Sequence, residues 1–277
     1  MIVEKSKPKI YEIGMDDMIE IDAAPNGNPV DYRNLNTQIH GAINANFTNI
    51  ILNNVCGQRF IGAGLQGNIE ITINGVPGND LGIFMDGPKI KVNGNCEDQS
   101  GNTMNQGTMV IDGDGGDVIG LSSRGGRIYV KGDVGYRVGI HMKEYEDQFP
   151  TLIIGGTAKD FLGESMAGGR IIALGLKILS DGTIIENSQP ICGTELGTGI
   201  HRGAIYLRTN EDIEHKLGVG AKIFDLSEEE QKEIKNDLID FCETFNIPLT
   251  IIDEKPFKVI RPISKRPHGS NYCGQLV

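Results

Sequence analysis

The sequence predicts an all-β protein: a parallel β-helix, or solenoid, built from coils about 20 residues long, with helical capping segments at both ends. Three observations support this fold. The chain has 38 glycines in 277 residues, well above the ordinary usage of ~7%. Pairs of an apolar residue and a glycine recur at nearly constant spacing, with glycines at positions 62, 82, 101, 120 and 139. Short apolar strand patterns follow these pairs, and no helical periodicity lies between them.

The repeated pairs define an internal order that holds along the chain. They are Ile61-Gly62, Leu81-Gly82, Ile119-Gly120, Val138-Gly139, Leu162-Gly163 and Leu196-Gly197, with Ser100-Gly101 in the same series. The third residue after each glycine is mostly large and apolar: Leu65, Met85, Met104, Ser123, Met142, Met166 and Ile200. Methionines in register could hold a cofactor, but methionine is a common core filler. We therefore expect these residues to stack as an inward-facing column.

A glycine bend and then a strand follow each pair. The strands read "IEITI", "KIKV", "TMVID", "RIYVKG", "RIIALG" and "AIYLR". In a parallel solenoid each coil stacks ~4.8 Å from the last, so corners recur at the same place. Glycine suits such corners because it accepts positive φ angles and close backbone approach. We expect Gly120→Val to cause misfolding, because it would add a branched side chain at an inward corner.

Three other motif assignments fail. Residues 60–67, "FIGAGLQG", match the G-x-G-x-x-G fingerprint of dinucleotide-binding proteins, but a strand rather than a helix follows. The leucine-rich repeat pattern L-x-x-L-x-L is absent. The stretch "DGDGGD" at 112–117 resembles one copy of a calcium-binding roll repeat, and one copy does not predict a calcium site.

Helices are expected near both ends, because an open solenoid end exposes strand edges that need covering. Near the N-terminus, Leu35, Ile39 and Ile43 form one helical stripe that Asp31 can cap. Near the C-terminus, Ser227 and Glu230 form a capping box. The apolar stripe of that helix is Ile234, Leu238, Phe241 and Phe245, and Pro248 follows its end.

The chain divides into three parts on this basis. Residues 1–48 form an N-terminal strand and helix cap, residues 49–210 the β-helix, and residues 211–277 a C-terminal helix-containing cap with a tail. The stretch "LTIID" at 249–253 is read as one more strand before that tail.

Two coils carry insertions, which in solenoids commonly emerge on one face and bind partners. One is "HMKEYEDQFP" at 141–150 and the other is "LKILSDGTIIENSQPICGTE" at 176–195. In the first, His141, Glu144, Glu146 and Asp147 could form a metal or acid–base cluster. No metal-ligand spacing such as H-x-x-x-H supports that assignment, so we interpret the segment as a solvated polar loop.

Composition excludes several classes of function. The net charge of −11 argues against nucleic-acid binding, although the tail "KVIRPISKRPHG" is locally basic and is read as a solvated or docked terminus. No leader peptide or membrane span is visible, so we expect a cytoplasmic protein without a membrane partner. The five cysteines show no C-x-x-C spacing, which fits reduced thiols and offers no zinc or iron–sulfur ligand set.

The assembled repeat resembles the GXGXG domain at the C-terminus of the large (alpha) chain of glutamate synthase, in particular its stand-alone form. The stretches that carry this resemblance are "NNVCGQRFIGAGLQG", "GVPGNDLGIFMDGP", "GNTMNQG", "GDVIGLSSRGGRIYVKGDVGYRVGIHMKEY" and "IIGGTAKDFLGESMAGG". They cover roughly residues 21–208.

The resemblance implies a right-handed parallel β-helix with a scaffolding role in making glutamate from glutamine and 2-oxoglutarate. In the family, a glutaminase part with an N-terminal cysteine and a synthase part with FMN and an iron–sulfur cluster carry the chemistry. Residue 2 here is Ile, and the cysteine cluster and FMN barrel are missing. No catalytic, cofactor-binding or metal-binding residue is therefore assigned to this chain. The expected partners are a glutaminase-type amidotransferase and an FMN and iron–sulfur synthase subunit, with a homo-oligomer also considered.

Two alternatives remain open on the sequence. Formylmethanofuran dehydrogenase contains the same repeat in one of its subunits, so the chain could be the scaffold of a complex of that kind. A stand-alone β-helix lyase or hydrolase would line successive coils with acid–base groups. Asp86, Arg124, Lys143 and Arg202 come near corresponding positions, but they alternate in sign and include no carboxylate pair.

Overall fold

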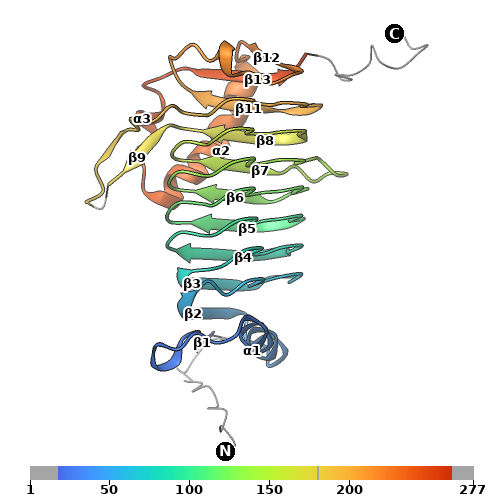
Figure 1. Ribbon diagram of the computed structural model, residues 1–277, viewed down its shortest axis with the longest axis vertical. Coiled ribbons are helices and arrows are strands. Elements are labelled where there is room, and N and C mark those ends of the chain that lie inside the picture. Colours follow the sequence, from blue (N-terminus) through green and yellow to red (C-terminus); the bar gives the residue numbers. More distant parts are fainter. Residues whose placement is uncertain (1–17, 180, 264–277) are drawn as a thin grey trace, which may run out of the picture.

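The computed structural model describes residues 18–179 and 181–263. The expectations about a leader peptide, Cys273 and the tail beyond residue 263 lie outside the described residues. One sheet contains eleven strands in the order β1-β2-β3-β4-β5-β6-β7-β8-β11-β13-β12. Strands β1 to β8 and β11 pair in parallel, coil upon coil (Figure 1), which confirms the parallel β-solenoid.

The parallel strands stay aligned at their inward residues along the stack, although bulges shift the register within the β2–β3, β4–β5 and β8–β11 pairs. They are β1 (Met18–Asp22), β2 (Asn49–Cys56), β3 (Glu70–Val76), β4 (Asp86–Asn93), β5 (Gln106–Ile111), β6 (Arg127–Val130), β7 (Thr151–Ile154), β8 (Ala167–Ala173) and β11 (Arg202–Arg208). Alternate side chains point inward, as expected for a strand. One inward column contains Ile50, Ile71, Ile90, Met109, Ile128, Leu152, Ile171 and Ile205, all nearly inaccessible to solvent. Each such side chain contributes roughly 1.5–3 kcal/mol of hydrophobic stabilisation.

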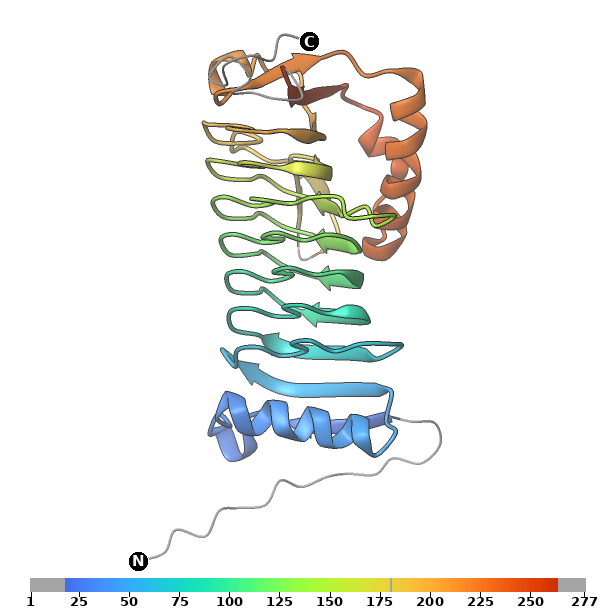
Figure 2. The ribbon, with the colours of Figure 1, turned by 90° about the vertical axis from the view of Figure 1, so that its right-hand side faces the viewer.

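The N-terminal cap forms as predicted. Helix α1 (Tyr32–Asn44) begins after Asp31, whose carboxylate accepts a hydrogen bond from the backbone N–H of Arg33 at 3.0 Å. Leu35 and Ile39 are buried against the first coil, and Ile43 is partly buried. A short 3-10 helix, η1 (Pro25–Gly27), joins β1 to this helix. Figure 2 shows α1 lying across the base of the stack beside β1.

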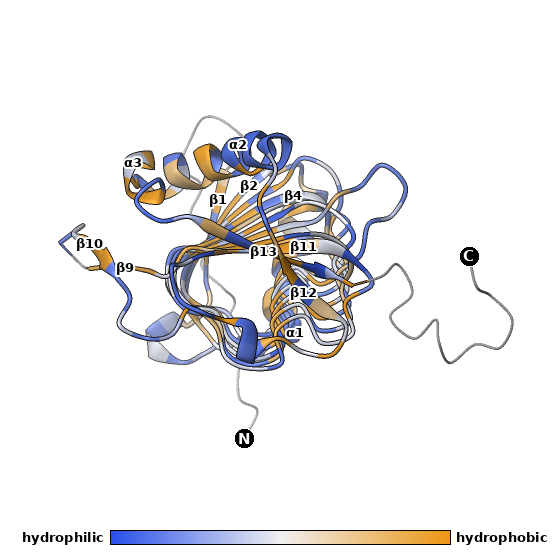
Figure 3. Ribbon diagram, turned by 90° about the horizontal axis from the view of Figure 1, so that it is seen from above, coloured by the Kyte–Doolittle hydropathy of each residue, from blue (hydrophilic) through white to orange (hydrophobic). Residues whose placement is uncertain are grey.

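The C-terminal helix forms as predicted, but it lies in a different place. Helix α2 (Glu228–Phe245) starts at the Ser227–Glu230 capping box. It packs along the side of the sheet instead of over its end (Figures 2 and 3). Phe241 contacts Tyr129 edge to face, with ring centroids 5.7 Å apart. Most of the outward residues beneath the helix are apolar, and their burial holds the helix on the side of the sheet.

The outer face of the sheet changes from polar to apolar along the stack, and this change decides where α2 packs. One outward column runs through Thr72, Lys91, Val110, Tyr129, Ile153, Ile172 and Tyr206. Lys91 is exposed, whereas the members from Val110 onward are buried. The early coils therefore keep a polar outer face, and the later coils need the helix to cover an apolar one.

Two expectations about the C-terminal region were wrong. The stretch "LTIID" forms a short helix, α3 (Leu249–Ile252), because a turn started by Pro248 buries Ile252. The last strands are instead β12 (Ala221–Phe224) and β13 (Phe257–Pro262), and β13 uses part of the segment that was read as tail. Both are antiparallel, β13 pairing with β11 and then β12 with β13. This end of the sheet is therefore closed by strands and not by a helix. The 3-10 helix η2 (Glu214–Lys216) precedes β12 in the chain.

The two insertions leave the regular coil. Residues 141–150 form a loop before β7, in which Tyr145 and Gln148 bridge each other. The second insertion forms a two-stranded antiparallel hairpin from β9 (Leu176–Ile178) and β10 (Ile184–Glu186), which projects from the stack (Figures 1 and 3).

Candidate functional site

The repeated glycine pairs form a stack of tight turns along one edge of the solenoid. We call the second residue of each pair the anchor glycine. All seven anchors have φ between +63° and +74°. From Gly82 onward, the backbone N–H of each anchor donates to a carbonyl on the preceding coil. The acceptor is the residue just before that coil's own anchor, so that Gly82 donates to Ile61 at 2.8 Å. The predicted column is confirmed, since Leu65, Met85, Met104, Ser123, Met142, Met166 and Ile200 are all buried.

A second left-handed position occurs two residues after each anchor. It is occupied by Gly64, Phe84, Thr103, Ser122, His141, Ser165 and Gly199, with φ between +50° and +69°. A Cβ atom on Gly64 would meet nothing within 4 Å. These residues point outward, so most coils tolerate a side chain there. This explains why the middle glycine of "FIGAGLQG" is missing from most copies.

The stack continues one turn beyond the series found in the sequence. Leu217 bridges Leu196, and the N–H of Gly218 donates to the carbonyl of Leu196 at 2.8 Å. Gly199 in turn donates to the carbonyl of Val219 at 2.8 Å. The run "LGVGA" at 217–221 repeats the form of "IGAGL" at 61–65. That similarity was the available signal, and sequence reasoning missed it.

Carboxylates on neighbouring coils form a second ladder that was not predicted. The Oδ1 atom of Asp114 accepts the backbone N–H of Asp133 at 2.8 Å, and Asp133 Oδ1 accepts that of Thr157 at 2.7 Å. A parallel row joins Asp98 to Asp117 and Asp117 to Tyr136, each at 2.8 Å. The 19-residue offset of these aspartates was readable in the sequence. The "DGDGGD" stretch therefore supplies structural acceptors that tie one coil to the next.

The four polar residues of the first insertion do not assemble into a metal site. Glu144 Oε1 accepts the backbone N–H of Gly169 at 3.0 Å, and its Oε2 lies 3.5 Å from Arg202. His141, Glu146 and Asp147 are exposed. Within residues 18–179 and 181–263, no three His, Cys, Asp or Glu side chains are grouped to hold a metal ion.

The residues considered for a lyase or hydrolase lie along one corner of the stack. Asp86 is paired with Gln66 and Gln106 on the adjoining coils, and Lys143 with Ala167. Arg124 places its guanidinium 5.8 Å from the ring of Tyr145. The corner alignment was correct, but the neighbours of Asp86 on the adjoining coils are amides, and the other nearby carboxylate, Glu144, is paired with Arg202.

Two buried arginines hold the C-terminal elements against the sheet. Arg170 of β8 pairs with Asp237 and Glu233 of α2. Arg208 of β11 is almost fully buried and donates to the carbonyls of Leu174, Ile251 and Ile252 and to Glu186 Oε1, at 2.7–3.2 Å. Burial works most strongly to raise the pKa of Glu186, but hydrogen bonds from Arg208 and Lys255 together lower it below its ordinary value. Both arginine side chains therefore bond within the chain and stabilise the packing of its C-terminal elements.

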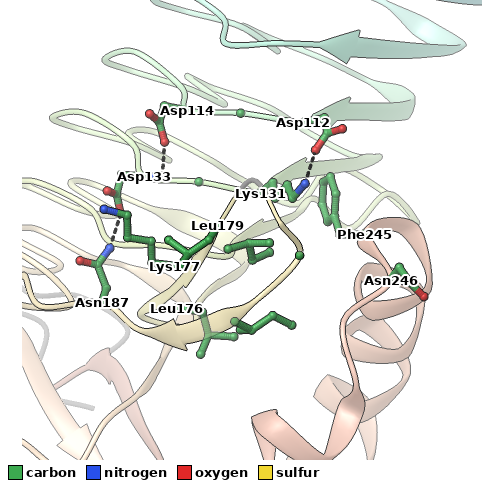
Figure 4. Close-up of a pocket in the computed structure, with 15 residues that line it drawn as sticks. Asp112, Asp114, Lys131, Asp133, Leu176, Lys177, Leu179, Asn187, Phe245 and Asn246 are labelled. Atoms are coloured by element: carbon green, nitrogen blue, oxygen red, sulfur yellow. Dashed lines mark hydrogen bonds and ion pairs between the residues drawn. The ribbon is translucent and has the colours of Figure 1, made fainter.

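A pocket of about 520 Å³ opens between the hairpin, the aspartate ladder and the end of α2 (Figure 4). Its polar side carries Lys131, paired with Asp112 at 2.7 Å, and Asn187, which donates to Asp133 at 2.9 Å. Its apolar side includes Leu179 and Phe245. Most of its charged side chains already bond within the chain, since Asp114 and Asp133 also accept backbone hydrogen bonds from the adjoining coils.

The three buried cysteines among the described residues are unsuited to nucleophilic chemistry. Cys96, Cys192 and Cys242 are buried, and desolvation raises the pKa of each thiol to about 11. A thiol with such a pKa is almost entirely protonated at neutral pH. Cys56 is exposed, and no disulfide joins the described cysteines.

These features define the class of protein: a parallel β-solenoid whose coils each turn at a left-handed anchor glycine and are tied together by backbone bonds and aspartate side chains. The chain belongs to the GXGXG motif family, which matches residues 32–257 and is the family of the glutamate synthase C-terminal domain. An uncharacterized protein of Methanocaldococcus jannaschii is 46% identical over 270 residues, covering 95% of this chain and 99% of that protein.

No described helix combines the length and apolar character needed to cross a bilayer.

Proposed function

We propose that this chain is a non-catalytic scaffold subunit of a glutamate synthase-type complex. In such a complex, separate glutaminase and FMN and iron–sulfur synthase subunits would make glutamate from glutamine and 2-oxoglutarate. The observation that carries this proposal is the GXGXG family match over residues 32–257. The use of Asp114, Asp133, Arg170 and Arg208 for internal bonds is consistent with it.

The two insertions are the surfaces on which we expect the partner chains to dock. They carry four exposed large apolar side chains: Tyr145 and Phe149 on the loop, and Leu179 and Ile185 on the hairpin. Exposed apolar side chains on projecting segments are typical of interfaces. Because Glu186 is bonded to the buried Arg208, the hairpin base is held at a fixed place on the solenoid.

Co-expression with a glutaminase-type chain and an FMN synthase-type chain tests the role. We expect the three chains to purify together, and we expect glutamate formation from glutamine and 2-oxoglutarate to require all three. A fully active assembly of the two enzymes without this chain would refute the scaffold function. Association with a molybdenum or tungsten oxidoreductase chain instead would favour the formylmethanofuran dehydrogenase-like alternative.

Variants locate the docking surfaces. Tyr145→Ser with Phe149→Ser, and separately Leu179→Ser with Ile185→Ser, are expected to weaken capture of one partner each. Phe84→Ser is the matched control, because Phe84 is equally apolar and exposed but lies on the turn stack outside both insertions. Loss of capture with the control and not with the double variants would place the interface on the turn stack.

A further inference from the structure

Strand β12 is the last strand of the sheet, and one of its edges has no partner strand among the described residues. Among the described residues it pairs only with β13. The N–H of Ile263 donates to the carbonyl of Gly220 at 2.9 Å. This bond shows which residues of β12 point their peptide groups toward β13. Because bonded positions alternate, Lys222 and Phe224 exchange hydrogen bonds with β13, while the peptide groups of Ile223 face away from it. Such an edge is a template for another strand.

Two apolar side chains beside this edge are unusually exposed. Val219 is 70% exposed and Ile263 is 63% exposed, the two highest values among the large apolar side chains that the structure describes. Both flank β12, since the N–H of Ile263 bonds Gly220, the neighbour of Val219. A surface of this kind at a strand edge is typical of an interaction site.

The run "AKIFD" at 221–225 is complementary to itself when two copies pair antiparallel about Ile223. In that register Lys222 of one copy lies opposite Phe224 of the other, which permits a cation–π contact. Lys222 already lies 5.9 Å from the ring of Phe224 in its own chain. A register centred on Lys222 would set two ammonium groups directly opposite each other, which is unfavourable.

We propose that the chain forms a two-fold symmetric homodimer through β12, joining two solenoids end to end in one continuous sheet. Ile223 exchanges two backbone hydrogen bonds with Ile223 of the second copy. The N–H of each Asp225 donates to the carbonyl of Ala221 across the interface. A two-fold contact of this kind is closed, so it yields a dimer and no filament. The proposal is independent of the scaffold function.

Light scattering on the full chain tests the assembly. We expect twice the mass of one 30.1 kDa chain at micromolar concentration. Asp225→Pro removes the outward N–H together with the carboxylate and should weaken the dimer about ten-fold or more, because it deletes two of four intermolecular bonds. Asp225→Ala is the matched control, since it keeps that N–H and should leave the dimer unchanged. A monomer, a larger polymer, or equal effects of both variants would overturn the proposal.

Cross-linking tests the register, in a chain carrying Cys56→Ser and Cys273→Ser. Ile223→Cys should form a disulfide-linked dimer on mild oxidation, because opposing strand residues lie about 5.5 Å apart in a bonded pair. Lys222→Cys should not, since position 222 faces position 224. Cross-linking by Lys222→Cys alone, or by neither variant, would contradict the Ile223-centred pairing.

Discussion

The Cδ1 atom of Ile171 lies 2.3 Å from the point where a Cβ atom on Gly139 would sit. Ile171 belongs to β8, further along the stack, and Gly139 has φ +71°. Two separate constraints therefore favour glycine at this anchor: the left-handed backbone conformation, and the side chain that packs against the position of a Cβ atom. Gly101 and Gly163 show the same crowding by isoleucine, at 2.4 and 2.5 Å.

Gly139→Ala should destabilise the protein by about 2–5 kcal/mol, combining ~1–2 kcal/mol for the left-handed backbone with ~1–3 kcal/mol for overpacking. Gly64→Ala is the matched control, because it has φ +64° but open space around its Cβ position. It should show only the backbone part. Urea unfolding of both variants measures the difference, and equal losses would show that the inward contact with Ile171 relaxes freely.

Tyr129→Phe should leave stability unchanged or raise it by up to about 1 kcal/mol. The Tyr129 hydroxyl is buried, and no described residue bonds to it. Burial accordingly raises the pKa of Tyr129. Tyr206→Phe serves as control, since the Tyr206 hydroxyl lies 3.4 Å from Glu230 Oε1 and its loss should be mildly destabilising. Thermal melts compare the two, and a marked loss with Tyr129→Phe would mean that its hydroxyl has a partner.

Arg208→Met should destabilise the protein by about 3–5 kcal/mol. The substitution leaves the carbonyls of Leu174, Ile251 and Ile252 without their donor and frees the base of the hairpin. Arg33→Met is the control, because the Arg33 side chain is exposed and its contact with Asp31 is 3.9 Å long, so its effect should stay within about 0.5 kcal/mol. Similar denaturation midpoints for both variants would show that the Arg208 network adds nothing.

Asp114→Asn should be neutral or stabilising, whereas Asp114→Ala should lose about 1 kcal/mol. Asparagine keeps the acceptor for the Asp133 N–H and removes one negative charge from the row that Asp114 shares with Asp133. Alanine removes the acceptor altogether. Guanidinium titrations of the two variants distinguish the roles, and equal losses would assign the ladder to charge and not to hydrogen bonding.

The protein should lose stability between about pH 9 and 11. Burial raises the pKa of Cys96, Cys192 and Cys242 from 9.0 to about 11. Unfolded thiols ionise first as the pH rises, so the unfolded state binds fewer protons in this window and is favoured. Each thiol can contribute up to about 1.4 kcal/mol per pH unit. Replacing Cys96 by Ala should flatten the fall in melting temperature, and an unchanged slope would count against a buried neutral thiol.

The sequence by itself determined the repeated coil, the inward column from Leu65 to Ile200 and the two long helices. These features depend on local periodicity and on capping residues such as Asp31, Ser227 and Glu230, which act within a few residues. The recurring anchor glycine was also readable, because each coil places its corner at the same point of the repeat.

Only the tertiary structure decided where α2 lies, how the sheet ends and what the polar side chains do. The position of α2 depends on Tyr129 and Phe241, which are far apart in the chain and meet only when the coils stack. The segment at 249–253 packs as a helix, and a later segment supplies β13, because strand pairing depends on partners that local propensity does not specify. The bonds of Arg208 likewise join separate segments of the chain. Such long-range contacts arise from burial in the assembled solenoid, and no local pattern encodes them.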